Sequence, residues 1–186
     1  MKESFHKKTD TRSTQRIRRL HADLSRICPY SVQGYQYFLL VMDDATRCMW
    51  VRFLKSKTTD KVYPMIKEIK VQIELETGQL VAFFRADNGK GEFRVMLQGF
   101  LKDLGIQLEP CPPYKHSLNR VVERAIRTVD ATTRSMIYEA KMLYQIWYYT
   151  IEYAVYLKNR LPTAALPFGP QESDTGSAET LFEAYK

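Results

Sequence analysis

The sequence has few of the residues that build disulfide frameworks, zinc sites or membrane spans. It contains three cysteines and three histidines in 186 residues, all widely separated, so a disulfide framework and a structural zinc site are not expected. Its longest apolar run, near Tyr37 to Met42, is far shorter than the roughly 18 residues of a membrane helix, and the chain opens with polar residues where a signal peptide would be apolar. We therefore expect an intracellular protein, nuclear or cytoplasmic, with no zinc and no membrane partner.

Positive charge outweighs negative charge, and most of the excess lies near the N-terminus. The formal net charge is +7, and residues 1–20 hold seven Lys or Arg against Glu3 and Asp10, so the other 166 residues carry only +2. An excess of positive charge suggests a polyanionic partner. For residues 1–19 we favour a solvated, disordered arm, with a dedicated DNA-binding arm as the alternative.

Apolar periodicity predicts one α/β domain. Alternating or dense apolar residues over 17–24, 35–42 and 49–54 predict three strands, the last two forming a hairpin. Helical spacing predicts a helix that ends before Gly78 and further helices over 93–104, 117–140 and 143–159, with short strands over 80–86 and 106–108. The predicted order is βββαβαβα. The predicted division is an arm over 1–19, a core over 20–161 and a loose tail over 162–186.

Three acidic residues lie at positions where their carboxylates could converge. Asp23 lies near the end of the first strand, Asp87 follows a later strand, and Glu123 lies on the polar face of the long helix. Carboxylates on rigid elements suit a pair of Mg²⁺ ions that binds the attacking and leaving oxygens of a displacement at phosphorus. Each acid also has a structural alternative: a solvated strand end for Asp23, hairpin-turn chemistry in Asp87-Asn88-Gly89, and an ion pair with Arg127 for Glu123.

Asp43 and Asp44 form a rival acidic pair. Side chains at adjacent positions of an extended chain point apart, and Asp43-Asp44-Ala45-Thr46 has the composition of a hairpin turn. We therefore predict a structural role for this pair.

Five short blocks, in sequence order, carry a resemblance to a known family. They are His21-Ala22-Asp23-Leu24, residues 37–44, Arg85-Ala86-Asp87-Asn88-Gly89 with Gly91-Glu92-Phe93, Asn119 to Arg124 with Arg127-Thr128, and residues 156–163. Together, with thirty-five residues between Asp87 and Glu123, they resemble the integrase catalytic core of copia-type retrotransposons, within the retroviral integrase superfamily.

The resemblance implies an RNase H-like fold, with a mixed five-stranded sheet flanked by helices. It also implies that Asp23, Asp87 and Glu123 hold two Mg²⁺ or Mn²⁺ ions while a DNA 3′-hydroxyl, or water, attacks a phosphodiester. The expected partners are the DNA of the element ends, target DNA and further copies of the chain, with no small-molecule substrate. As phosphate contacts we select Lys115, His116, Asn119, Arg120, Arg127 and Arg134.

Three departures from the family pattern define an alternative. Leu118-Asn119-Arg120 stands where the family usually has Gln-Asn-Gly, and an arginine there could crowd the approach of DNA or add a phosphate contact. The family's upstream zinc-binding segment and downstream DNA-binding domain are not in this sequence. The alternative to an active integrase core is therefore a catalytically silent relic, or a co-opted module that only binds nucleic acid.

Overall fold

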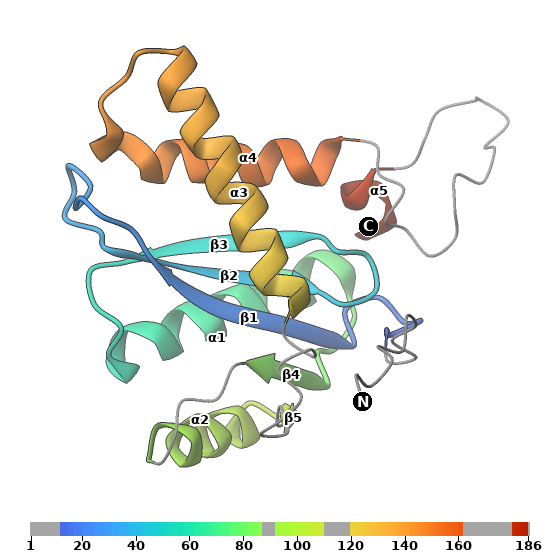
Figure 1. Cartoon of the computed structure of the whole chain (residues 1–186). Helices are drawn as coiled ribbons and strands as arrows, with labels where there is room; N and C mark the ends of the chain where they lie inside the picture. The colour runs from blue at the N-terminus through green and yellow to red at the C-terminus, as the bar shows by residue number, and fades with distance from the viewer. Residues whose placement is uncertain (1–11, 87–91, 110–119, 162–179, 186) are drawn as a thin grey trace, which may run out of the picture.

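A five-stranded mixed sheet organises the fold (Figure 1). The computed structural model describes residues 12–86, 92–109, 120–161 and 180–185. Strands β1 (Arg19–Arg26), β2 (Tyr37–Asp43) and β3 (Met49–Leu54) are antiparallel neighbours. Strands β4 (Phe83–Ala86) and β5 (Gln107–Glu109) extend the sheet in parallel from β1, which gives the order β3-β2-β1-β4-β5. The α/β class, the five strands and the predicted element order are confirmed.

Six helical segments follow in the described residues. They are α1 (Thr59–Thr77), α2 (Glu92–Asp103), α3 (Arg120–Glu139), the 3₁₀ turn η2 (Tyr144–Ile146), α4 (Trp147–Arg160) and α5 (Leu181–Tyr185). Helix α1 ends at Gly78, which has a left-handed φ of 66° and donates its N–H to the Glu74 carbonyl oxygen, as a glycine C-cap does. Strand β4 starts three residues later than predicted; just before it, the Val81 N–H bonds to the Glu74 carboxylate.

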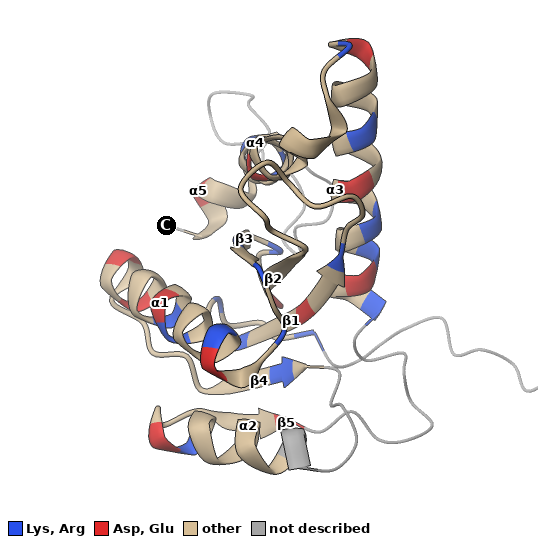
Figure 2. Cartoon of the chain, turned by 90° about the vertical axis from the view of Figure 1, so that its left-hand side faces the viewer, with Lys and Arg blue, Asp and Glu red and all other residues tan. Residues whose placement is uncertain are grey.

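The helices form two layers, one on each face of the sheet (Figures 1 and 2). One apolar cluster joins the sheet to α1, α2 and α5, and the other joins it to α3 and α4. On β1, Leu20, Ala22 and Leu24 belong to the first cluster. Because side chains alternate along a strand, His21 and Asp23 face the side that α3 covers.

Residues 180–185 differ from the predicted loose tail. Thr180 and Glu183 cap α5 reciprocally, with the Thr180 N–H 2.7 Å from a Glu183 carboxylate oxygen and the Glu183 N–H 3.2 Å from the Thr180 hydroxyl. The buried Tyr185 ring packs edge to face on Trp50, with 5.1 Å between the ring centroids. The Thr-x-x-Glu spacing is a capping-box signal in the sequence. None of the helices in the described part of the chain has the length and hydrophobicity to cross a membrane.

Candidate active site at the β1–β4 edge

Parallel pairing of β1 and β4 brings two predicted acidic positions to the same edge. The register pairs Ala22 with Ala86. Asp23 and Asp87 are the next residues in the two segments, so the chain approaches both acids from neighbouring, parallel strands. Asp87 itself lies outside the described residues.

Asp23 lies inside β1, because the strand continues to Arg26. Its side chain is half-buried, and its Oδ1 accepts the Leu24 N–H at 2.8 Å. The alternative of a solvated strand end is therefore wrong. A half-buried carboxylate on a central strand has a fixed direction, which suits a ligand position.

Glu123 lies in the first turn of α3, the helix that packs against β1 and β2. Its neighbour Val122 is fully buried in the α3 cluster, and Glu123 is half-buried at the margin of that contact. The ion pairs among the described residues do not include one between Glu123 and Arg127. The predicted alternative of a surface ion pair is thus not formed, although the helix dipole favours an acid in a first turn.

Asp23 and Glu123 lie on elements that face each other. Figure 1 shows the N-terminal end of α3 against β1, and Asp23 is on the side of β1 that α3 covers. Within the described residues no group of three or more His, Cys, Asp or Glu side chains is placed to hold a metal ion. The third predicted ligand, Asp87, falls outside those residues.

The outer face of α3 is basic near its start, and basic positions recur along the helix in Figure 2. Arg120, Arg124 and Arg127 are exposed and form no ion pair with a described residue. Arg134 is also exposed, but it pairs with Asp130 at 2.9 Å, and this hydrogen bond raises the pKa of Arg134. Arg124 is not among the predicted phosphate contacts, although a count of 100° per residue places it beside Arg120 and Arg127. The predicted contacts Lys115, His116 and Asn119 lie outside the described residues.

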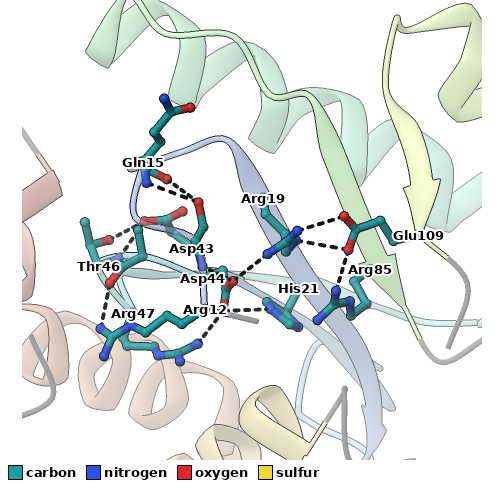
Figure 3. Close-up of polar contacts among 12 residues, drawn as sticks. Arg12, Gln15, Arg19, His21, Asp43, Asp44, Thr46, Arg47, Arg85 and Glu109 are labelled. Carbon is teal, nitrogen blue, oxygen red and sulfur yellow. Dashed lines mark hydrogen bonds and ion pairs between the residues drawn. The ribbon is translucent and has the colours of Figure 1, made fainter. Parts of the chain in front are cut away.

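A buried polar cluster lies at the start of β1 and in the turn between β2 and β3 (Figure 3). The fully buried Asp43 carboxylate accepts the Ile17 N–H at 2.9 Å and the Thr46 N–H and hydroxyl at 2.8 and 2.7 Å. Burial raises the pKa of Asp43, while the bonds from Thr46 and Ile17 oppose the rise. These bonds organise the hairpin turn, so the structural role predicted for Asp43 is confirmed.

Asp44 has a different set of partners. Its carboxylate accepts the Ser13 N–H at 2.7 Å and pairs with Arg19 at 3.2 Å and Arg47 at 2.9 Å, while His21 Nε2 lies 3.1 Å away. Burial opposes its ionisation, but the His21 imidazole, the Ser13 amide and Arg47 together hold the pKa of Asp44 below its ordinary value. Asp44 is therefore a buried anion that joins the N-terminal segment, β1 and the turn.

Glu109 of β5 closes the cluster. It accepts two bonds from Arg19, at 3.0 and 2.9 Å, and one from Arg85 of β4, as Figure 3 shows. Burial raises the pKa of Glu109, but the two arginines outweigh burial and lower it below its ordinary value. The network fixes three adjacent strands just ahead of the two acidic positions.

The sequence is similar to retrotransposon polyproteins of plants. It is 33% identical over 163 residues to the retrovirus-related Pol polyprotein from transposon TNT 1-94 of Nicotiana tabacum, an alignment that covers 85% of this chain and 12% of the polyprotein. It is 30% identical over 154 residues to the Pol polyprotein from transposon RE2 of Arabidopsis thaliana, covering 83% of this chain and 10% of that protein. The chain thus spans about a tenth of the length of these relatives. No protein-family model matches the sequence.

The fold is similar to solved retroviral integrases. The catalytic core domain of BIV integrase matches with a TM-score of 0.60 and 16% identity, over 91% of this chain and 93% of that one. The HTLV-2 integrase catalytic core domain matches with a TM-score of 0.61 and 14% identity, over 92% of this chain and 97% of that one. A chain of a simian T-cell lymphotropic virus intasome matches with a TM-score of 0.68 and 13% identity, over 94% of this chain and 56% of that one. The mixed sheet with its flanking helices is the RNase H-like fold that the sequence predicts.

Proposed function

We propose that this chain, which belongs to the copia-type retrotransposon branch of the retroviral integrase superfamily, is an integrase core that joins DNA 3′ ends to target DNA. The proposal rests on the parallel register of β1 and β4, which pairs the residue before Asp23 with the residue before Asp87. Helix α3 packs on β1 with Glu123 in its first turn. In this proposal, the carboxylates of Asp23, Asp87 and Glu123 act together at this edge of the sheet.

The donor set fits hard divalent ions. Asp23, Asp87 and Glu123 offer only carboxylate oxygens, which Mg²⁺ and Mn²⁺ prefer. When bound, two such ions would stabilise the charge on the attacking and leaving oxygens of the phosphodiester. The similar HTLV-2 core is described in complex with magnesium, which supports the choice of metal. The buried network around Asp44 and Glu109 holds β1 and β4 in place, and so keeps Asp23 in a fixed position.

The exposed arginines of α3 bind the DNA in this proposal. Arg120, Arg124 and Arg127 lie on the helix that carries Glu123, so phosphates bound to them would pass close to the acids. Such contacts position a duplex without selecting its sequence. The related HTLV-2 structure is described as a dimeric form and the simian viral one as an intasome. These descriptions support assembly of further copies of this chain on DNA.

A strand-transfer assay on labelled DNA tests the proposal. The parent protein should join DNA ends in Mg²⁺ or Mn²⁺ and lose this activity in EDTA. Asp23→Asn, Asp87→Asn and Glu123→Gln should each reduce it to background, because each removes a charged ligand. Glu139→Gln, an exposed acid at the other end of α3, is the matched control and should be active. Activity that survives Glu123→Gln would rule out the assignment of Glu123.

Arg120 separates this proposal from the silent-relic alternative. It is exposed at the first residue of α3, three positions before Glu123. If Arg120 contacts phosphate, Arg120→Gly should weaken DNA binding and lower strand transfer. If the parent is inactive and Arg120→Gly restores strand transfer, the crowding caused by the arginine had silenced the site, and the relic alternative is correct.

A further inference from the structure

A basic groove lies beside the start of β1, on the N-terminal side of Asp23. One pocket of about 500 Å³ has four arginines and no acidic residue in its lining; its residues are Arg12, Ser13, Thr14, Gln15, Arg18, Arg19, Phe83 and Arg85. A second pocket of about 460 Å³ shares Thr14, Gln15 and Arg18 with the first and adds Arg16 and residues 79, 80 and 82. The two pockets share residues and adjoin along the segment that precedes β1, and we refer to them together as the basic groove.

The arginines of this groove fall into two groups. Arg19 and Arg85 pair with Glu109, and Arg19 also pairs with Asp44, so their charges are largely compensated. Arg12, Arg16 and Arg18 have no carboxylate partner among the described residues. The groove therefore carries uncompensated positive charge.

Three contacts hold the guanidinium groups of Arg12 and Arg18 in place. Arg18 lies over the Phe83 ring, 5.6 Å from its centroid, and donates to the Gln15 side chain at 2.6 Å. Arg12 donates to the Ala45 carbonyl oxygen at 2.6 Å. Burial lowers the pKa of Arg12 and the neighbouring Arg47 lowers it further, while the Asp44 and Asp43 carboxylates raise it. Pre-ordered guanidinium groups lose less side-chain entropy when they bind a phosphate.

Part of the groove lies on the same face of the sheet as Asp23. Phe84 packs into the α1 cluster, so Phe83 and Arg85 face the α3 side, as Arg19, His21 and Asp23 do. Four residues of strand separate Arg19 from Asp23, about 13 Å at the usual rise of a strand. A DNA strand advances about 3.4 Å for each nucleotide. A strand with a phosphate at the acids would therefore reach the groove a few nucleotides away.

We propose that Arg12, Arg16 and Arg18 form a second binding site for the phosphate backbone of nucleic acid, separate from the basic face of α3. Arg12, Arg16 and Arg18 are spread over two adjoining pockets, which suits successive phosphates of one strand better than a single small anion. The spatial relation to the acids rests on the proposed function, but binding of nucleic acid at the groove does not. The described part of the arm is thus a docked element with its own ligand.

Binding of a short fluorescent DNA duplex in EDTA, measured by anisotropy over a series of KCl concentrations, tests this site. The double variant Arg16→Gln/Arg18→Gln should bind roughly tenfold more weakly, and the slope of log affinity against log salt should fall by about 0.9 for each phosphate that is no longer neutralised. Both residues are exposed, so the fold should persist, which circular dichroism and the thermal midpoint would check. Inorganic triphosphate should compete poorly, because it spans too little of the groove.

The matched control is Lys57→Gln/Lys67→Gln, which removes two exposed charges in and just before α1. If log affinity falls with log salt equally steeply for Arg16→Gln/Arg18→Gln and for this control, the proposal of a second site is wrong. Efficient competition by triphosphate would overturn it in favour of a small-anion pocket. The result is independent of catalysis: an inactive parent with the predicted slopes would refute only the proposed function, and an active parent with unchanged slopes would refute only the second site.

Discussion

Asp44 shows how one residue can join separate parts of the chain. Its carboxylate is almost fully buried, yet it receives hydrogen bonds or ion pairs from the N-terminal segment, from β1 and from its own turn. A buried charge of this kind contributes little net energy while it is paired, but removing one partner leaves the others uncompensated. Its role is to fix the geometry at the start of β1, a few residues before Asp23.

Asp44→Asn should lower the free energy of unfolding by roughly 3 to 5 kcal/mol. The substitution would leave the largely buried Arg19 and Arg47 side chains with a neutral partner in place of a carboxylate. Urea denaturation followed by circular dichroism measures the loss. Asp103→Asn, at an exposed position at the end of α2, should stay within about 0.5 kcal/mol of the parent. Equal stability of the two variants would contradict the structural role of Asp44.

Asn159 has a comparable role in the α4 layer. Its buried amide accepts the Met49 N–H at 3.0 Å and donates to the Met49 carbonyl oxygen at 2.8 Å, which fixes the end of α4 to the start of β3. Asn159→Leu should cost roughly 2 to 3 kcal/mol, because both Met49 groups would lose their partner. Urea midpoints measure this, with Glu152→Leu at an exposed α4 position as the control. A cost no larger than that of the control would show that water replaces the amide.

At the scale of elements, α5 is held to the core through aromatic contacts. The guanidinium carbon of Arg160 on α4 lies 3.8 Å from the centroid of the Tyr156 ring and 4.4 Å from that of Phe182. The Tyr185 hydroxyl bonds to Glu76 of α1 at 2.9 Å, and its ring packs on Trp50. A five-residue helix has little stability of its own, so these tertiary contacts keep it folded.

Tyr185→Ala should therefore destabilise the protein by about 3 kcal/mol, the usual cost of removing a buried aromatic side chain. Urea denaturation, followed by the fluorescence of Trp50 and Trp147, measures the effect. Tyr138→Ala is the matched control, because Tyr138 is 81% exposed on α3. If both substitutions cost the same small amount, α5 does not contribute to the folded core.

The regular elements could be predicted because their apolar residues follow the period of the element that buries them. On α1, apolar residues recur at spacings of four, three and four, and all of them are buried: Val62, Ile66, Ile69 and Ile73. Residues 12–18 and α5 gave a weaker signal, since their order depends on contacts with distant residues such as Asp44 and Trp50. A capping box marks the start of α5, but nothing local shows that its apolar face has a place to pack.

The candidate site was predictable in its residue types and only partly in its geometry. The sequence places Asp23 on a strand and Glu123 on a helix, and both placements are confirmed. The parallel pairing of Ala22 with Ala86 is a long-range contact that no local pattern encodes. The stacking of Arg18 on Phe83 is another such contact, and it makes residues 12–18 part of a groove.

At the scale of the whole molecule, two apolar layers stabilise the sheet, and one charged network crosses it. Asp44 and Glu109 belong to this network, and both have a pKa below the ordinary value in the folded protein. When the folded pKa of an acid is the lower one, the unfolded chain binds the proton first. The stability from these two acids is thus complete above their unfolded pKa, about 4, and is lost as the pH falls through the folded value. Burial raises the pKa of Asp43, so the folded protein binds this proton before the unfolded chain does. Asp43 therefore opposes the loss of stability in acid.

Acid should therefore unfold the protein, and Glu109→Gln should change how steeply it does so. The variant should be less stable than the parent at neutral pH, because Arg19 and Arg85 lose their charged partner. Its stability should then fall less steeply than that of the parent as the pH drops below about 5, since the missing carboxylate no longer takes up a proton. Urea midpoints at a series of pH values measure both curves, with Glu139→Gln as the control. A constant offset between Glu109→Gln and the parent at every pH would show that the Glu109 charge contributes nothing to stability, and the network would then owe its strength to Asp44 alone.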